Sequence, residues 1–68
     1  MTLVRAISDL LSMMPGPDAD IADRVKFFQR KAEVFDRVAA EDAEHSTEAA
    51  ELAQKARTQA SELAGGAS

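Results

Sequence analysis

Hydrophobic side chains in the middle of the chain recur at alternating intervals of four and three residues. The first series consists of Ile21, Val25, Phe28, Ala32, Phe35 and Ala39. This alternation keeps the apolar side chains on one narrow stripe of a helix, and it is typical of helices that pack along a partner helix. A second series with the same alternation follows at Ala49, Ala53, Ala56, Ala60 and Leu63. Together the two series predict two long helices, over about 19–42 and about 47–64.

The two stripes fit each other if the chain folds back near Glu44. Phe35 then faces Ala53, and Phe28 faces Ala60. A large side chain opposite a small one allows two helix surfaces to interdigitate without voids. The pattern therefore predicts an antiparallel helical hairpin with a break in the acidic stretch 41–44, because carboxylates are unfavourable at a helix C-terminus. One continuous helix through 41–47 remains an alternative, since that stretch has no glycine or proline.

A shorter amphipathic helix is predicted before the hairpin, over about 3–13. Leu3, Ile7, Leu10 and Met14 repeat the spacing of four and three, and Thr2 is a suitable N-cap. A Pro-Gly-Pro sequence ends the helix, because proline removes a backbone donor and restricts the residue before it. A helix of this length does not persist in water without packing, so it must bind another surface.

The expected ends of the two long helices follow from their polar residues. Asp18 or Asp20 starts the second helix, and Ser46 or Thr47 caps the third. A glycine pair stops the third helix and leaves 65–68 as a flexible tail. Residues 1–64 are thus expected to form a single helical domain.

The second helix carries an additional apolar stripe on its flank, formed by Phe27, Val34 and Val38. Either the N-terminal helix or a second copy of the chain must cover this stripe. A chain of 68 residues without cysteine is marginally stable alone, which favours self-association. We therefore predict an all-α fold, an antiparallel helical hairpin with a short N-terminal helix that assembles into a dimeric helical bundle; a three-helix monomer is the alternative. The expected core and interface residues are Phe27, Phe28, Val34, Phe35, Val38, Ala53, Ala56 and Ala60.

Composition and charge narrow the possible locations and partners. The net charge of −4 argues against a general affinity for nucleic acid or anionic lipid. No apolar run approaches the roughly 20 residues that span a bilayer, and no signal peptide is recognisable at the N-terminus. These features, with the lack of cysteine, predict a cytoplasmic protein without membrane contact.

The chain offers little catalytic chemistry. The serines have no nucleophile-elbow context, and one histidine provides little general-base chemistry. Asp42 and His45 have the spacing of half a di-iron ligand pair, but such ligands project into a bundle core, whereas this pair belongs to a predicted exposed turn. We therefore predict no enzyme activity, no cofactor and no metal site.

Two non-catalytic functions remain. The first is a small protein-interaction or regulatory module that binds itself and an unidentified protein partner. In this reading the N-terminal helix either packs on the hairpin or offers Leu3, Ile7 and Leu10 to the partner. The alternative is a nucleic-acid-binding helical dimer that contacts phosphates through Lys26, Arg30 and Arg37 on the second helix.

The segments 27–42 and 48–64 resemble short helical proteins of GC-rich actinobacteria. The first reads Phe-Phe-Gln-Arg-Lys-Ala-Glu-Val-Phe-Asp-Arg-Val-Ala-Ala-Glu-Asp, and the second is rich in alanine. This resemblance covers about half of the chain and implies no particular activity. The hairpin is also similar in architecture to Rop-like hairpins, acidic RNA-binding proteins that dimerise into four-helix bundles. That similarity is an analogy of fold alone, and the N-terminal helix departs from the Rop pattern.

Overall fold

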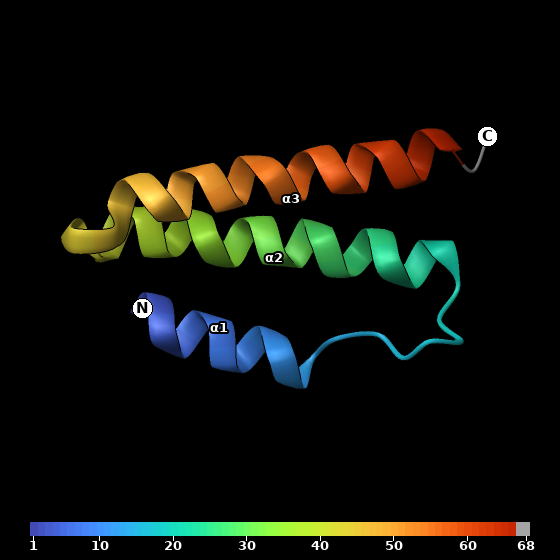
Figure 1. Ribbon diagram of the computed structural model, residues 1–68, viewed down its shortest axis with the longest axis horizontal. Helices are drawn as coiled ribbons and strands as arrows, with labels where there is room; N and C mark the ends of the chain where they lie inside the picture. The colour runs from blue at the N-terminus through green and yellow to red at the C-terminus, as the bar shows by residue number, and fades with distance from the viewer. Residues whose placement is uncertain (67–68) are drawn as a thin grey trace.

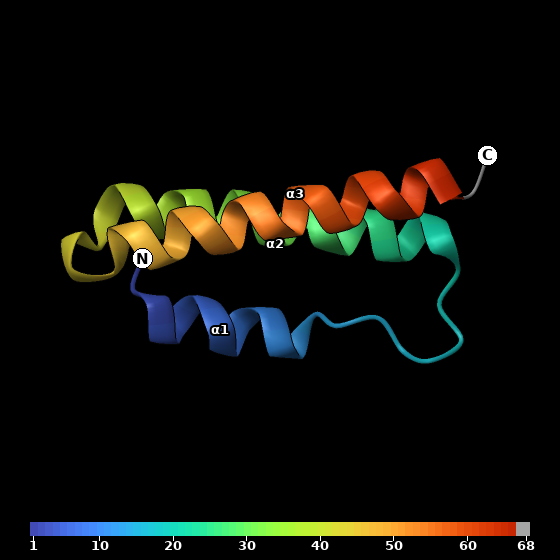
Figure 2. The same ribbon diagram turned by 45° about the horizontal axis from the view of Figure 1, so that its top comes forward.

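The computed structural model describes residues 1–66, which are helical apart from the chain start, a linker and a turn residue. Helix α1 spans Leu3–Ser12 and α2 spans Ile21–Glu41, after which a short 3-10 turn, η1 (Ala43–His45), leads into α3 (Ser46–Gly66). Helices α2 and α3 lie antiparallel along their length, and α1 lies beside α2 (Figures 1 and 2). The predicted all-α class is confirmed, as is the packing of the two long helices on each other.

The starts of α1 and α2 are capped by the residue types that favour this position. The Thr2 hydroxyl accepts a hydrogen bond from the backbone N–H of Arg5 at 3.3 Å. The Asp20 carboxylate accepts one from the backbone N–H of Asp23 at 2.9 Å. Each cap satisfies a donor that has no partner inside its helix. Thr2 and Asp20 are therefore confirmed as caps, and Asp18 does not take this role in the structure.

The turn between α2 and α3 is made by one extended residue and one 3-10 turn. Asp42 leaves the helix with φ −112° and ψ 92°. Ser46 already has helical angles, φ −56° and ψ −48°, and is the first residue of α3. A continuous helix is thereby excluded. The predicted cap at Ser46 or Thr47 is wrong, because η1 runs directly into α3 and both residues lie inside that helix.

Helix α3 is longer than the sequence pattern indicated. It continues through Gly65 to Gly66, whereas its end was expected at 64. A glycine costs a helix roughly 1 kcal/mol relative to alanine, which a terminal turn tolerates. The rest of the predicted tail, Ala67 and Ser68, lies outside the described residues.

The core between α2 and α3 joins large side chains of one helix with alanines of the other. Phe35 and Val38 of α2 belong to the same buried cluster as Ala49 and Ala53 of α3. Ala56 is completely buried as well. Phe35 and Ala53 therefore lie in one core, as expected if aromatic side chains of α2 pack on alanines of α3.

Helix α1 covers the second apolar stripe of α2. Ala6 and Leu10 are buried in the cluster that contains Val34 and Val38. The linker after α1 is held to α2 by the Arg24 guanidinium, which donates to the carbonyls of Pro17 and Ala19 at 3.1 and 3.2 Å. Of the two covers considered for the Val34–Val38 stripe, the structure thus shows the N-terminal helix of the same chain.

The three helices form a shallow layer with α2 in the middle. The Cα trace measures 38 by 22 by 11 Å. Figure 1 looks down this shortest dimension and shows α1 and α3 on opposite sides of α2. Within the described residues, no helix is long and apolar enough to cross a membrane.

Candidate functional site: an apolar groove

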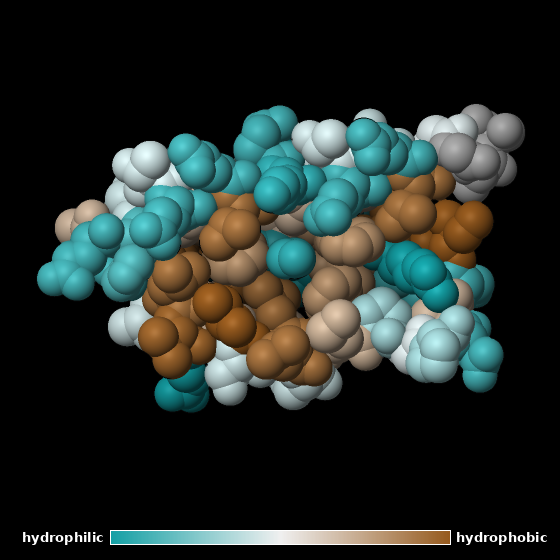
Figure 3. All heavy atoms as spheres, in the orientation of Figure 1, coloured by the Kyte–Doolittle hydropathy of each residue, from teal (hydrophilic) through white to brown (hydrophobic). Residues whose placement is uncertain are grey.

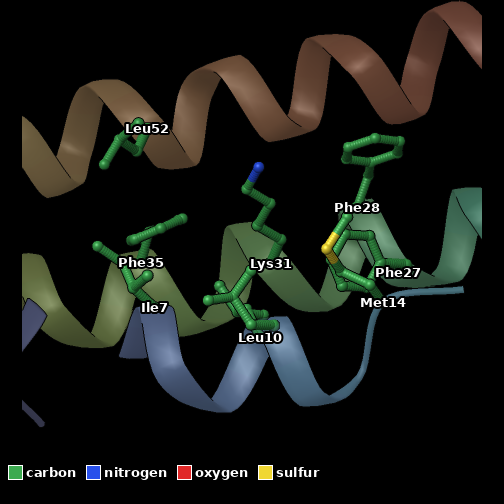
Figure 4. A pocket seen from close by; sticks show the side chains of 9 residues that line it. Ile7, Leu10, Met14, Phe27, Phe28, Lys31, Phe35 and Leu52 are labelled. Carbon is green, nitrogen blue, oxygen red and sulfur yellow. The ribbon is translucent and has the colours of Figure 1, made fainter. Parts of the chain in front are cut away.

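An open groove runs along α2 between α1 and α3. Its volume is about 460 Å³, which is within the range of roughly 300–1,000 Å³ typical of binding pockets. Figure 4 shows side chains from all three helices around it. The lining residues are Ile7, Leu10, Leu11, Met14, Phe27, Phe28, Lys31, Phe35 and Leu52.

The floor of the groove is one face of α2. Phe27, Lys31 and Phe35 follow one another at intervals of four residues, so they lie on the same side of the helix. The rings of Phe27 and Phe28 meet edge to face, with centroids 5.5 Å apart and planes at 66°. This geometry is favourable for aromatic pairs and gives the floor a defined shape.

One wall of the groove is an exposed stripe of α1. Ile7, Leu11 and Met14 are 43%, 64% and 58% exposed, although all three are large and apolar. Ile7 and Leu11 are four residues apart on one side of α1, next to the buried pair Ala6 and Leu10, and Met14 follows just beyond the end of the helix. Figure 3 shows a continuous hydrophobic area on this face of the molecule. A contiguous patch of this kind marks an interaction surface, whereas scattered apolar residues do not.

Lys31 is the one charged residue among the nine that line the groove. Its ammonium group lies 5.7 Å from the centroid of the Phe28 ring, within the range of a cation–π interaction. Beyond Leu52 the groove borders a shallow depression on α3 that is lined by Glu48, Glu51 and Lys55. The apolar surface is thus bounded by charges of both signs.

A polar cluster at the turn holds the start of α1 against the hairpin. The Asp42 Oδ2 atom accepts a hydrogen bond from the backbone N–H of Leu3 at 3.3 Å and lies 2.9 Å from His45 Nδ1. The Met1 ammonium group also pairs with Glu41. A carboxylate at the first N–H groups of α1 is favoured by the helix dipole, so these contacts position the helix that forms the groove wall.

Each of these contacts changes the pKa of a participating group. The hydrogen bond to His45 is the largest cause that lowers the pKa of Asp42; desolvation opposes it, and the weaker effect of the bond from Leu3 lowers the pKa further. Conversely, the hydrogen bond to Asp42 raises the pKa of His45 above 6.5. The ammonium group of Met1 lowers the pKa of Glu41. All three shifts favour the charged forms of these groups.

The residues predicted to bind a protein partner do not share one environment. Leu10 is 4% exposed and belongs to the core, although it also lines the groove, and its partner-binding role stays a prediction. Leu3 is half-buried and packs against the core, because its helix docks on the hairpin. Only Ile7 of the three is exposed on the groove. Leu11 and Met14 were not among the predicted partner-binding residues, although the apolar spacing that includes Met14 and the position of Leu11 beside it were a signal for them in the sequence.

The predicted core and interface residues form two groups in the structure, one buried in the single chain and one lining the groove. Six of them are buried in the single chain, namely Val34, Phe35, Val38, Ala53, Ala56 and Ala60. The other two, Phe27 and Phe28, are half-buried and line the groove. The two aromatic residues therefore remain available to a partner.

The basic residues proposed for nucleic-acid binding lie away from the groove. Lys26, Arg30 and Arg37 are exposed on α2. Arg30 faces a carboxylate, with 3.5 Å between its Nη1 atom and Glu33 Oε2. Arg30 and Arg37 share a small depression with Glu33. The surface has mixed charge, and nucleic-acid binding stays a prediction.

Asp42 and His45 have the spacing of a metal ligand pair, but in the structure their side chains contact each other. Among the described residues, no group of three or more His, Cys, Asp or Glu side chains is arranged to hold a metal ion.

No protein-family model, curated protein or solved structure matches the chain. The resemblances to actinobacterial helical proteins and to Rop-like hairpins stay predictions, and the functional argument rests on the groove.

Proposed function

We propose that this chain is a non-catalytic protein-interaction module that acts as a homodimer, in which each copy closes the groove of the other. The observation that supports this proposal is the apolar groove, whose α1 wall is exposed and whose floor includes two half-buried phenylalanines. Large contiguous apolar surfaces are uncommon on monomeric proteins and are found where a partner binds.

The arrangement of the helices supports a second copy as the occupant. Stable domains place their core between packed layers of secondary structure. This chain is shallow, with 11 Å as the shortest dimension of its Cα trace, and one broad face carries the groove. A second copy placed on this face provides the missing layer and encloses Phe27 and Phe28.

The dimensions of the surface are also suitable. A compact monomer of 7.3 kDa is expected to expose about 4,200 Å², whereas this chain exposes 4659 Å². A standard interface takes about 800 Å² from each partner, and a face of 38 by 22 Å is large enough to supply it. The excess exposed area therefore fits a surface that is covered in a dimer.

The core of the single chain is small, which favours additional burial. Four large hydrophobic side chains are buried among the described residues, Leu10, Val34, Phe35 and Val38, and the other buried hydrophobic residues are alanines. Alanine removes little apolar area from water, so these contacts contribute little to folding. Association is a common source of stability for chains of this size.

The proposal is tested by the Leu11→Glu variant. Leu11 is 64% exposed in the single chain, so the substitution leaves its fold intact but places a charge in the proposed interface. We expect the wild-type protein to sediment as a dimer and Leu11→Glu to sediment as a helical monomer, as measured by analytical ultracentrifugation and circular dichroism. Ile21→Glu is the matched control, because Ile21 is 46% exposed and does not line the groove.

The control is expected to remain dimeric. A wild-type protein that stays monomeric at the highest soluble concentration contradicts the proposal. A Leu11→Glu variant that dimerises as tightly as the wild type contradicts the assignment of the groove as the interface.

A further inference from the structure

We propose that the groove binds the hydrocarbon chain of a fatty acid, whose carboxylate pairs with the ammonium group of Lys31. The fatty acid covers the same side chains as a second copy of the protein, so it competes with dimerisation. The competition rests on the proposed homodimer, whereas the binding depends only on the groove of a single chain.

Lys31 differs from the other lysines of the chain in its surroundings. Lys26 and Lys55 are exposed, whereas Lys31 is half-buried. Its ammonium group lies 5.7 Å from the centroid of the Phe28 ring, and the ion pairs among the described residues do not include it. A lysine normally lays its stem on apolar surface and keeps its charged end in water. An occupant of the groove removes this water, which is strongly unfavourable unless the occupant brings an anion to the cation.

The remaining lining restricts the other parts of the occupant to hydrocarbon. Of the nine residues that line the groove, all except Lys31 are apolar, so their side chains offer no strong hydrogen-bond donor or acceptor. A nucleotide or a sugar carries many polar groups, and each one that is buried here without a partner is unfavourable. A fatty acid has one anionic end and otherwise methylene groups, so its chemistry matches the single cation and the apolar lining.

The groove separates its charge from its apolar wall. In Figure 4 the nitrogen atom of Lys31 lies on the side of α3, whereas Ile7 and Leu10 come from α1 on the opposite side. A carboxylate at Lys31 therefore leaves the hydrocarbon chain to lie over the aromatic floor and against the α1 wall. The volume of about 460 Å³ is typical of a small-molecule site.

A second copy does not provide this anion from its own groove. The one charged side chain of its groove lining is again Lys31. The fatty acid neutralises the cation and covers Ile7 and Leu11, which are exposed in the single chain. A ligand that binds only the separated chain shifts the equilibrium toward that chain by mass action. The fatty acid therefore favours the monomer.

Opposite head groups on one hydrocarbon chain test the anion site. We expect decanoate, below its micellar concentration, to bind the wild-type protein at least about tenfold more tightly than decylammonium, as measured by NMR titration of the 15N-labelled protein. The net charge of −4 favours the cation if no specific anion site exists, so a preference for decanoate is diagnostic. Hexanoate has a shorter chain and should bind more weakly, by up to about fourfold for each methylene group that it lacks.

The Lys31→Met variant tests which residue binds the carboxylate, because it removes the cation but keeps an unbranched side chain. We expect it to bind decanoate at least about tenfold more weakly than the wild type. Lys26→Met is the matched control, since Lys26 is an exposed lysine of the same helix that does not line the groove. The control should bind decanoate within about twofold of the wild type. Circular dichroism checks that both variants retain their helices.

Analytical ultracentrifugation tests the competition with the second copy. A concentration of decanoate that just saturates the wild-type protein should convert its dimer into monomer. The same concentration should leave most of the Lys31→Met protein dimeric, because this variant binds the ligand more weakly. A decanoate-bound wild-type protein that remains dimeric overturns the competition.

The other outcomes separate this inference from the proposed function. A wild-type dimer that does not bind decanoate, or binds decylammonium equally well, overturns the fatty-acid site but leaves the homodimer standing. Lys31→Met with wild-type affinity for decanoate overturns the role of Lys31. Binding to phosphatidylglycerol vesicles without binding of decanoate assigns the groove to a membrane surface and also overturns the inference. A protein that is monomeric without ligand but binds decanoate through Lys31 overturns the homodimer and the competition, and leaves the site.

Discussion

At the scale of single residues, Asp42 determines how α1 meets the hairpin. One carboxylate oxygen serves the first backbone N–H of α1 and the imidazole of the turn, while the residue itself ends α2. Its side chain is 16% exposed, so the contacts are partly shielded from water. A single acidic residue thus connects three elements, and the spacing Asp-x-x-His has a structural role here.

The Asp42→Asn variant tests the charge of this contact. Asparagine retains an acceptor for the Leu3 N–H but removes the carboxylate, whose hydrogen bond first and whose charge second raise the pKa of His45. We expect an NMR titration of the His45 ring to give a pKa above 6.5 in the wild type and a value closer to 6.5 in Asp42→Asn. Glu44→Gln is the control and should shift the pKa less, because Glu44 is the smallest of the contributing causes. Identical titration curves for the wild type and Asp42→Asn would rule out the contact.

The same pair makes stability depend on pH in a defined direction. The raised pKa of His45 means that its contribution is complete below 6.5 and is lost as the pH rises through the folded-state value. The lowered pKa of Asp42 means that its contribution is complete above 3.8 and is lost as the pH falls through the folded-state value. The stabilisation is therefore greatest between these two pH values and should be missing in Asp42→Asn.

At the scale of the elements, the sequence pattern was sufficient for the hairpin because its determinants are local and periodic. The stripe that contains Phe35 and the stripe that contains Ala53 predicted which faces of α2 and α3 meet, and both residues are in the core. Thr2 and Asp20 were recognisable as caps since a cap bonds a backbone N–H three residues away.

The contacts that position α1 were not predictable in the same way. The bond between Leu3 and Asp42 joins residues 39 apart, and no periodicity encodes it. The 3-10 turn before Ser46 also has no glycine or proline signal. The groove depends on the angle at which α1 docks, so its lining could not be read from the sequence, although each of its helices could.

The small residues of α3 define the distance to α2, and Ala53→Leu tests this packing. Ala53 is completely buried in the cluster with Phe35. Additional methyl groups at this position have no space, and overpacking of a core typically costs about 1–3 kcal/mol. We expect the free energy of unfolding, measured by urea denaturation, to fall by about this amount. Ala50→Leu is the control, because Ala50 is exposed on the same helix and its substitution should change stability by less than about 0.5 kcal/mol. Equal stabilities of the two variants would contradict the observed face of α3.

At the scale of the whole molecule, the sequence left two covers for the flank of α2, and the structure shows one of them, the N-terminal helix of the same chain. Helix α1 of the same chain covers Val34 and Val38. Phe27 and Phe28 remain on the groove, together with the exposed stripe of α1. The single chain therefore buries part of its apolar surface, and the proposed homodimer would bury the remaining apolar surface at the groove.

The most direct test of this account is an isotope-filtered NOESY experiment on an equimolar mixture of 13C-labelled and unlabelled wild-type protein, which detects contacts between copies and not within them. The account predicts intermolecular cross-peaks at the methyl groups of Ile7, Leu11, Met14 and Leu52 and at the rings of Phe27 and Phe28. Intermolecular cross-peaks confined to residues outside the groove, such as Ile21, or none at concentrations where the protein is fully folded, would contradict it.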